Sequence, residues 1–174
     1  MLKDLKPALG ILFRFILIYF VLFIGYQWYL KSTEVGGLDP YSRWVAGQVN
    51  TVQEFLGYPS HTEHFPQWHT EYFYINHQAV TRMVEGCNAI SVMMLCIAFV
   101  FAFYQGGKTW WYAVGSICFL HVINVLRIAG INLIYVEYEA YSEPAHDYLF
   151  PAVIYGSVVG IWLVWMKMVN KNTK

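Results

Sequence analysis

The sequence has 174 residues, of which 57% are apolar and only 13% are charged, and its formal net charge is zero. A soluble domain of this length could not bury so much apolar surface, so we expect a lipid bilayer to solvate part of the chain. The balanced charge excludes nucleic-acid binding as the main function, and three cysteines, an odd number, give no disulfide framework.

Four apolar stretches are long enough to cross a bilayer, whose apolar core of about 30 Å takes about 20 helical residues. They predict an all-α membrane protein, a four-transmembrane-helix bundle that forms a single integral membrane domain over residues 1–174. The first stretch exceeds the apolar region of a signal peptide and no A-x-A site follows it, so we expect it to be retained. The predicted spans cover about residues 9–30, 86–104, 110–136 and 148–169.

The distribution of lysine and arginine predicts the orientation of these spans, because short cytoplasmic loops are rich in both. With a cytoplasmic N-terminus, the inner segments contain six basic residues among 21, whereas the outer segments contain three among 66. Both termini are therefore expected in the cytoplasm. The inner basic residues are Lys3, Lys6, Lys108, Lys167, Lys171 and Lys174.

The outer loop, residues 31–85, is expected to hold two small elements. Asp39 and Pro40 predict the N-cap and first residue of a helix, and Gly57 predicts its end. An apolar stripe at helical spacing makes this helix amphipathic, as is typical of helices on the outer membrane interface. Further along, β-forming residues flank Asn76-His77 and predict a short β-hairpin. The stripe consists of Trp44, Val45, Val49, Val52, Phe55 and Leu56.

Arg127 is unusual because a charge within a membrane span is costly and generally faces a protein interior or a cavity. It lies 17 residues after Trp110, which we place at the inner aromatic belt. That spacing, about 26 Å of helix, brings Arg127 close to the outer boundary of the apolar core. The arginine alone fits an interface anchor equally well, but Asn124, one turn earlier, favours a polar pocket that opens outward.

Two further residues at the outer ends of spans have chemistry of interest. Cys87 is expected at the start of the second span, where the helix dipole favours a thiolate. By contrast, Cys96 and Cys118 lie within spans and are expected as small apolar core residues. His146 precedes Asp147, the expected N-cap of the fourth span, and an imidazole there suits proton transfer. The structural alternatives are an inert helix-start cysteine and a solvated loop histidine.

The predicted topology brings these residues to one place. The second span starts outside, the third ends outside and the fourth starts outside, so Cys87, Arg127 and His146 share one outer rim. A thiol nucleophile, a fixed cation and an imidazole base are the groups that acyl transfer requires. The sequence therefore indicates an acyl-transfer site on the outer side.

These stretches also resemble the core of the exosortase/archaeosortase family of membrane cysteine transpeptidases. Residues 84–90 are similar to the family's cysteine segment, residues 124–128 match its N-x-x-R-I helix, and His146 followed by Gly156 completes the order Cys, Arg, His. The resemblance spans roughly residues 80–160, and the short chain is similar to the compact F-type branch. The family commonly has Cys-Ser-Gly where this chain has Cys87-Asn88-Ala89.

The resemblance implies a role for each site residue. Cys87 would be the nucleophile, Arg127 its electrostatic partner and His146 the third catalytic residue, with Asn124 and Asn88 binding substrate or supporting the site. By the same resemblance the protein would be a thiol protease and transpeptidase of the bacterial inner (cytoplasmic) membrane, with its active site facing the periplasm or exterior. It would need no cofactor and no metal.

The implied partners are exported proteins whose C-terminal signal consists of a short motif, a membrane helix and a basic tail. The enzyme would cleave this signal through a thiol acyl-enzyme and pass the acyl group to an unidentified acceptor nucleophile. The lipid bilayer would be a further partner, and nucleic acid would not.

Two other functional classes remain open at this stage. A non-catalytic membrane subunit could bind a partner helix through Gly156-x-x-x-Gly160, and in such a protein Cys87 would be dispensable. A metal or redox protein could use the histidines, but His121 has no partner at i+4 and the loop histidines lack ligand spacing. These loop residues are His61, His64, His69 and His77.

Overall fold

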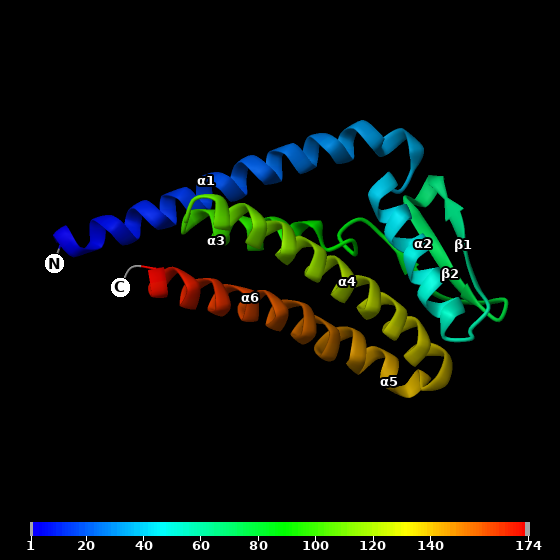
Figure 1. Cartoon of the computed structure of the whole chain (residues 1–174). Coiled ribbons are helices and arrows are strands. Elements are labelled where there is room, and N and C mark those ends of the chain that lie inside the picture. Colours follow the sequence, from blue (N-terminus) through cyan, green and yellow to red (C-terminus); the bar gives the residue numbers. More distant parts are fainter. Residues whose placement is uncertain (1, 173–174) are drawn as a thin grey trace. The chain divides into compact units, whose positions relative to one another are not determined.

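A computed structural model describes residues 2–172, so Met1 and residues 173 and 174 of the predicted inner segments lie outside the described part. The described chain is mainly helical and carries a small antiparallel sheet (Figure 1). The helices are α1 (Leu2–Thr33), α2 (Pro40–Phe55), α3 (Ile90–Ala102), α4 (Gly107–Glu137), α5 (Glu139–Pro144) and α6 (Phe150–Asn172). The strands are β1 (Ser60–Phe65), β2 (Thr70–Ile75) and β3 (Gln78–Met83).

Within residues 2–172, three helical segments are long and apolar enough to cross a membrane. They include the predicted spans 9–30, 110–136 and 148–169, so the prediction of a mainly helical membrane protein is confirmed at this level. The segments are Lys6–Gly36, Gly107–Glu137 and Glu139–Lys171.

The second predicted span, residues 86–104, is longer than the helix that forms there. α3 has 13 residues, or about 20 Å of helix, against an apolar core of about 30 Å. Gly86 and Ala89 have φ angles of 93° and 61°, which a helix does not accommodate, so α3 begins only at Ile90. Gly106, with φ of 66°, precedes the start of α4. The count of four spans therefore stays a prediction.

The segment that connects the third and fourth predicted spans, residues 137–147, is nearly all helical. α5 follows α4 after Tyr138, whose N–H still donates to a carbonyl of α4 at 2.8 Å. Between α5 and α6 the helix widens into a π turn, η3 (Ala145–Leu149), where the N–H of Phe150 reaches five residues back. Asp147 lies inside this turn and does not cap α6, contrary to prediction.

The chain divides into two compact units. The first comprises Met1–Trp28, Ile90–Leu120 and Tyr155–Lys174, and the second comprises Tyr29–Ala89 and His121–Ile154. The second unit thus contains both the predicted outer loop and the predicted outer ends of the spans. Cys87, Arg127 and His146 all belong to it.

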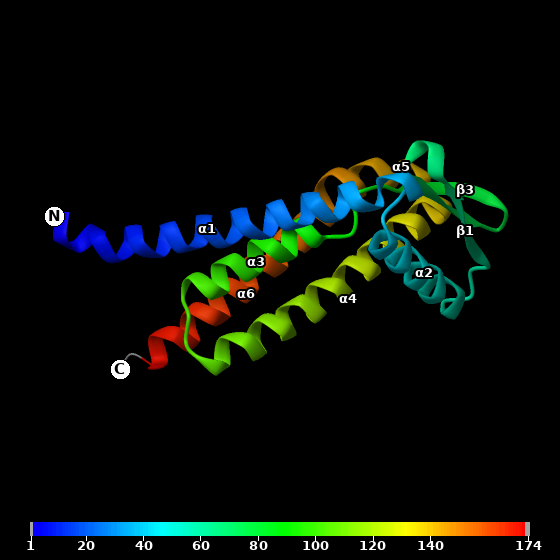
Figure 2. The ribbon, with the colours of Figure 1, turned by 90° about the horizontal axis from the view of Figure 1, so that it is seen from above.

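The first unit is held by aromatic packing between α3, α4 and α6, which run side by side in it (Figures 1 and 2). Trp165 is fully buried beside Val100 of α3. The ring of Trp162 stacks on Phe99 at a centroid distance of 4.4 Å. The hydroxyl of Tyr112 donates to a carbonyl of α6 at 2.7 Å. Cys118 of α4 is exposed, contrary to the expectation of a core residue, whereas Cys96 is buried as expected.

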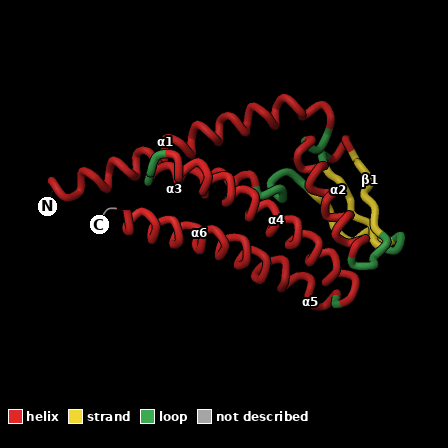
Figure 3. The backbone as a smooth tube through the Cα atoms, in the orientation of Figure 1, coloured by secondary structure: helices red, strands yellow, loops and turns green. Residues whose placement is uncertain are grey.

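The second unit contains a three-stranded antiparallel sheet in the order β1-β2-β3 (Figure 3). The predicted hairpin is confirmed: Asn76 and His77, with φ of 51° and 67°, form the tight turn between β2 and β3. The sequence did not predict β1, because most of its residues are polar. Its side chains alternate between more and less buried positions only in the folded sheet, where β1 pairs with β2. Phe73 of β2 and Met83 of β3 pack into the core of the unit.

α2 starts and ends as predicted. The carboxylate of Asp39 accepts a hydrogen bond from the N–H of Ser42 at 3.0 Å, and Pro40 is the first helical residue. Only part of the apolar stripe is free to meet lipid, because Val45 and Val49 are fully buried in the core of the unit. The stripe residues that remain exposed are Trp44, Phe55 and Leu56.

Candidate active site

A cavity of about 70 Å³ in the second unit contains all three residues predicted to be catalytic. Cys87 comes from the turn after β3, Arg127 from α4 and His146 from the π turn η3. Three elements that are distant in sequence therefore contribute one chemically distinct side chain each. The remaining lining residues are Thr81, Arg82, Met83, Ile128, Ile131 and Asn132.

Cys87 lies in a turn and not at a helix start, which corrects the sequence-based expectation. Its N–H donates to the carbonyl of Val84 at 3.1 Å, and α3 begins three residues later. The side chain is half-buried and packs against the core of the unit while also lining the cavity. The thiol is therefore positioned by the backbone of a turn and does not lie at the N-terminus of a helix.

Asn124 links Cys87 to Arg127. The side-chain amide of Asn124 donates to the carbonyl of Cys87 at 2.9 Å, and its oxygen accepts from Nη1 of Arg127 at 3.3 Å. The predicted stacking of Asn124 and Arg127 on one face of α4 is thus present. Asn124 itself is fully buried. Because its contacts fix both neighbours, it holds the cysteine turn against α4.

Arg127 has an incomplete set of partners. Its Nε is buried and without a hydrogen-bond partner, and no carboxylate within the described residues forms an ion pair with it. The guanidinium is positively charged, has no carboxylate partner among the described residues and belongs to a residue that lines the cavity. The arrangement favours an anion or a polarised oxygen as the ligand of this cavity.

Asn132 is a site residue that sequence reasoning missed. It lines the same cavity and its side chain is 0% exposed. Its oxygen accepts a hydrogen bond from the hydroxyl of Thr81, while its Nδ2 is buried and has no partner. A polar residue near the end of a span is ordinary, so the sequence offers no signal beyond the asparagine itself. Asn132 is therefore, besides Arg127, a second lining residue with a buried and unpaired donor.

His146 has a carboxylate neighbour in the π turn. Its Nδ1 lies 2.9 Å from Oδ1 of Asp147, and its side chain is 63% exposed. A hydrogen bond at Nδ1 leaves Nε2 as the nitrogen free to accept a proton. Asp147, expected only as a helix cap, thus orients the imidazole.

Asn88 points away from the cavity into a buried polar network. Its side-chain amide donates to Oγ of Ser42 at 2.9 Å, and that hydroxyl in turn donates to the carboxylate of Asp39. All three residues are fully buried. Asn88 therefore anchors the turn that carries Cys87 to the start of α2.

Ala89 occupies the position at which the resembling family commonly has glycine. Its φ of 61° lies in the left-handed region, which glycine adopts freely and alanine adopts at a cost of about 1 kcal/mol. Although this chain has alanine where the family commonly has glycine, the backbone at residue 89 has a conformation that suits glycine.

The histidines outside the cavity have local structural contacts. The ring of His121 lies between the hydroxyl of Tyr41 at 3.1 Å and Oε1 of Gln48 at 2.6 Å, and it stacks on Trp44. Burial, together with the charge of Asp39, raises the pKa of Tyr41, so this hydroxyl stays protonated. Among the described residues no cluster of three or more His, Cys, Asp or Glu side chains is arranged to hold a metal ion.

Comparison of the chain with family models, with curated proteins and with solved structures finds no match.

Proposed function

We propose that this chain is an exosortase-like membrane cysteine protease and transpeptidase that cleaves the C-terminal sorting signal of exported proteins. The observation that carries the proposal is the shared cavity lined by Cys87, Arg127 and His146. The resemblance nominates the same three residues in the same order. An inert cysteine or an interface arginine would not need the other two residues beside it.

The first half of the reaction forms an acyl-enzyme. His146 takes the proton of the Cys87 thiol, and the thiolate sulfur attacks the carbonyl carbon of the scissile peptide bond. When the tetrahedral intermediate collapses, the carbon–nitrogen bond breaks. His146 returns its proton to the departing amine, and the C-terminal helix and basic tail leave. The exported protein is then held on Cys87 as a thioester.

Arg127 and Asn132 are suited to stabilise the negative oxygen of this intermediate. Nε of Arg127 and Nδ2 of Asn132 are both buried donors without partners, and both residues line the cavity of the nucleophile. Donors that are already fixed where charge develops stabilise a transition state without reorganisation. In the second half of the reaction an acceptor nucleophile attacks the thioester carbonyl, and the same donors serve again.

The membrane arrangement follows from the charge pattern. We place the site at the outer face of a bacterial inner membrane, with four spans and both termini in the cytoplasm, because the basic residues concentrate in the predicted inner segments. A substrate anchored by its own C-terminal helix, with the basic tail inside, carries its motif at the height of Cys87. Diffusion in the plane of the membrane then brings substrate to enzyme.

The test is the fate of a tail-bearing exported protein encoded near this gene, in cells that carry Cys87→Ala. The variant should accumulate normally, since a half-buried turn residue contributes little packing energy, yet leave the precursor uncleaved. Cys118→Ala is the matched control, because it removes an exposed thiol outside the cavity and should process normally. Unchanged processing by abundant Cys87→Ala would overturn the proposal and favour a non-catalytic membrane subunit.

A further inference from the structure

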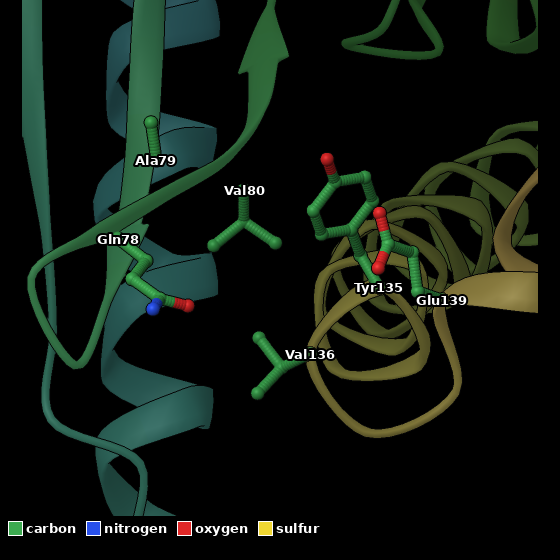
Figure 4. Close-up of a pocket in the computed structure, with 6 residues that line it drawn as sticks. All are labelled: Gln78, Ala79, Val80, Tyr135, Val136 and Glu139. Carbon is green, nitrogen blue, oxygen red and sulfur yellow. The ribbon is translucent and has the colours of Figure 1, made fainter.

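A second cavity lies between the same two parts of the chain as the Cys87 cavity. It has a volume of about 310 Å³. Figure 4 shows Val80 of β3 opposite Val136 of α4, with the hydroxyl of Tyr135 and the carboxylate of Glu139 on the helical side. Gln78 and Ala79 complete the lining on the strand side.

The two cavities lie along successive stretches of β3 and α4. On β3, residues 81–83 line the first cavity and residues 78–80 line the second. Along the helix, the first cavity ends at Asn132 and the second begins at Tyr135, one turn later. Three residues of strand cover about 10 Å, which is also the reach of three residues of an extended peptide.

We propose that the second cavity binds the substrate peptide on the amino side of the scissile bond, at the fourth residue from that bond. This inference rests on the proposed function and on its orientation, in which α4 runs outward past Arg127. The membrane helix of the substrate lies on the carboxyl side, so the peptide that extends outward from Cys87 is the acyl portion. β3 is the edge of the sheet, and the backbone groups on its outer side can pair with an extended peptide.

The charges that line the two cavities predict which substrate residue fits best. Glu139 contributes the charged side chain of the second cavity, whereas Arg82 and Arg127 line the first. A lysine or arginine at the fourth position would meet the carboxylate of Glu139, and an acidic residue there would be repelled. Glu139 is exposed, so solvent screening limits this preference to about fivefold.

The test measures how fast acetylated peptidyl chloromethyl ketones alkylate Cys87 in membranes that contain the full-length chain. In this reaction the thiolate sulfur displaces chloride and forms a carbon–sulfur bond, which mass spectrometry of the Cys87 peptide detects. The reagents are acetyl-Ala, acetyl-Ala-Ala-Ala-Ala, and the tetrapeptides with Lys or Glu as the first residue. We expect the tetra-alanine reagent to react at least tenfold faster than the single-residue reagent. We expect the Lys reagent to react about fivefold faster than the Glu reagent.

Variants of the second cavity should abolish these ratios. Ala79→Trp fills the cavity and should bring the ratio of tetrapeptide to single-residue rates close to one, whereas Ala140→Trp, on an exposed neighbour of Glu139, should keep it. Glu139→Gln should remove the preference for Lys over Glu, and Glu143→Gln, one turn away, should retain it.

The outcomes separate this inference from the proposed function. If all four reagents alkylate Cys87 of the unmodified chain at equal rates, the proposed peptide site is wrong, while the role of Cys87 is still decided by precursor processing. If the ratios of the alkylation rates are unchanged in both Ala79→Trp and Glu139→Gln, the proposed peptide site is also wrong, because the peptide must then bind elsewhere. Normal processing by Cys87→Ala overturns the proposed function whatever the reagents show.

Discussion

Residues 87 and 88 are neighbours in the chain, yet their side chains belong to polar regions of opposite kinds. Asn88 joins a buried network in which Ser42 and Asp39 bond to each other and to the capped start of α2. Cys87 faces a cavity where a nitrogen of Arg127 and a nitrogen of Asn132 are buried without partners. The first region is satisfied within the protein, and the second is not.

The difference teaches which buried polar groups hold the fold and which await a ligand. Each buried donor left unpaired costs about 1–3 kcal/mol, and two of them belong to residues that line the cavity of Cys87. A carbonyl oxygen that gains negative charge would satisfy both. The satisfied network on the other side keeps the turn rigid while that happens.

The largest effect is expected at Arg127. Arg127→Lys should lower processing almost as much as Arg127→Ala, on the order of 10³-fold, although it keeps the positive charge. A lysine ammonium presents a point charge and cannot reproduce the planar set of donors with which the guanidinium bonds Asn124 and lines the cavity. The measurement is the precursor-to-product ratio at equal enzyme abundance. Near-normal processing by the lysine variant would show that a diffuse positive field is sufficient.

Asn132→Ala should lower processing by about 100-fold, the typical effect of removing one donor to a developing oxyanion. Asn132→Ala also removes the hydrogen bond that the Thr81 hydroxyl donates to Asn132. Thr81→Val removes this hydrogen bond alone, because the donor nitrogen of Asn132 remains. We expect less than a tenfold loss in Thr81→Val, measured by the same ratio. Equal losses in the two variants would assign Asn132 a structural role.

A smaller effect is expected at Asp147. Asp147→Asn should lower processing about threefold, because the carboxylate orients His146 but both side chains are more than half exposed and solvent screens their interaction. Glu143→Gln, which removes an exposed carboxylate of α5, is the matched control and should have no effect. A loss of 100-fold or more in Asp147→Asn would mean that this carboxylate takes a direct part in proton transfer.

The smallest effect on processing is expected from a change in the hydrogen-bonded network of Asn88, Ser42 and Asp39. Asn88→Ala should destabilise the protein by about 1–3 kcal/mol, because it leaves a buried hydroxyl of Ser42 short of a partner. Thermal unfolding in detergent should reveal the loss. Processing per enzyme molecule should stay within about twofold of normal. A large loss of turnover without a change in stability would place Asn88 in the reacting region instead.

Much of this molecule follows from local sequence patterns. The long apolar stretches, the Asp39-Pro40 start of α2 and the turn at Asn76-His77 depend on neighbouring residues alone. Three of the four stretches lie in long apolar helices, and the start of α2 and the turn form as predicted. The candidate site was also recognisable, because a charge, a thiol and an imidazole at one rim are unusual in so apolar a chain. Their common cavity agrees with that expectation.

The rest depends on information that local patterns do not carry. The late start of α3 follows from positive φ angles at Gly86 and Ala89, and alanine gives no sign of such a conformation. Asp147 was expected to cap the start of the fourth span, whereas it lies inside a π turn that continues the helix. The role of Asn132 depends on Thr81, 51 residues earlier in the chain.

The central claim is that Cys87 carries the exported protein as a thioester during turnover. The most direct measurement is mass spectrometry of the Cys87 peptide after an acid quench of membranes that are actively processing precursor. The account predicts an adduct of the acyl fragment on Cys87 that neutral hydroxylamine removes, that is absent from Cys87→Ala and that persists in Cys118→Ala. An adduct on a different residue, or processing that continues after Cys87 is replaced by alanine, would contradict it.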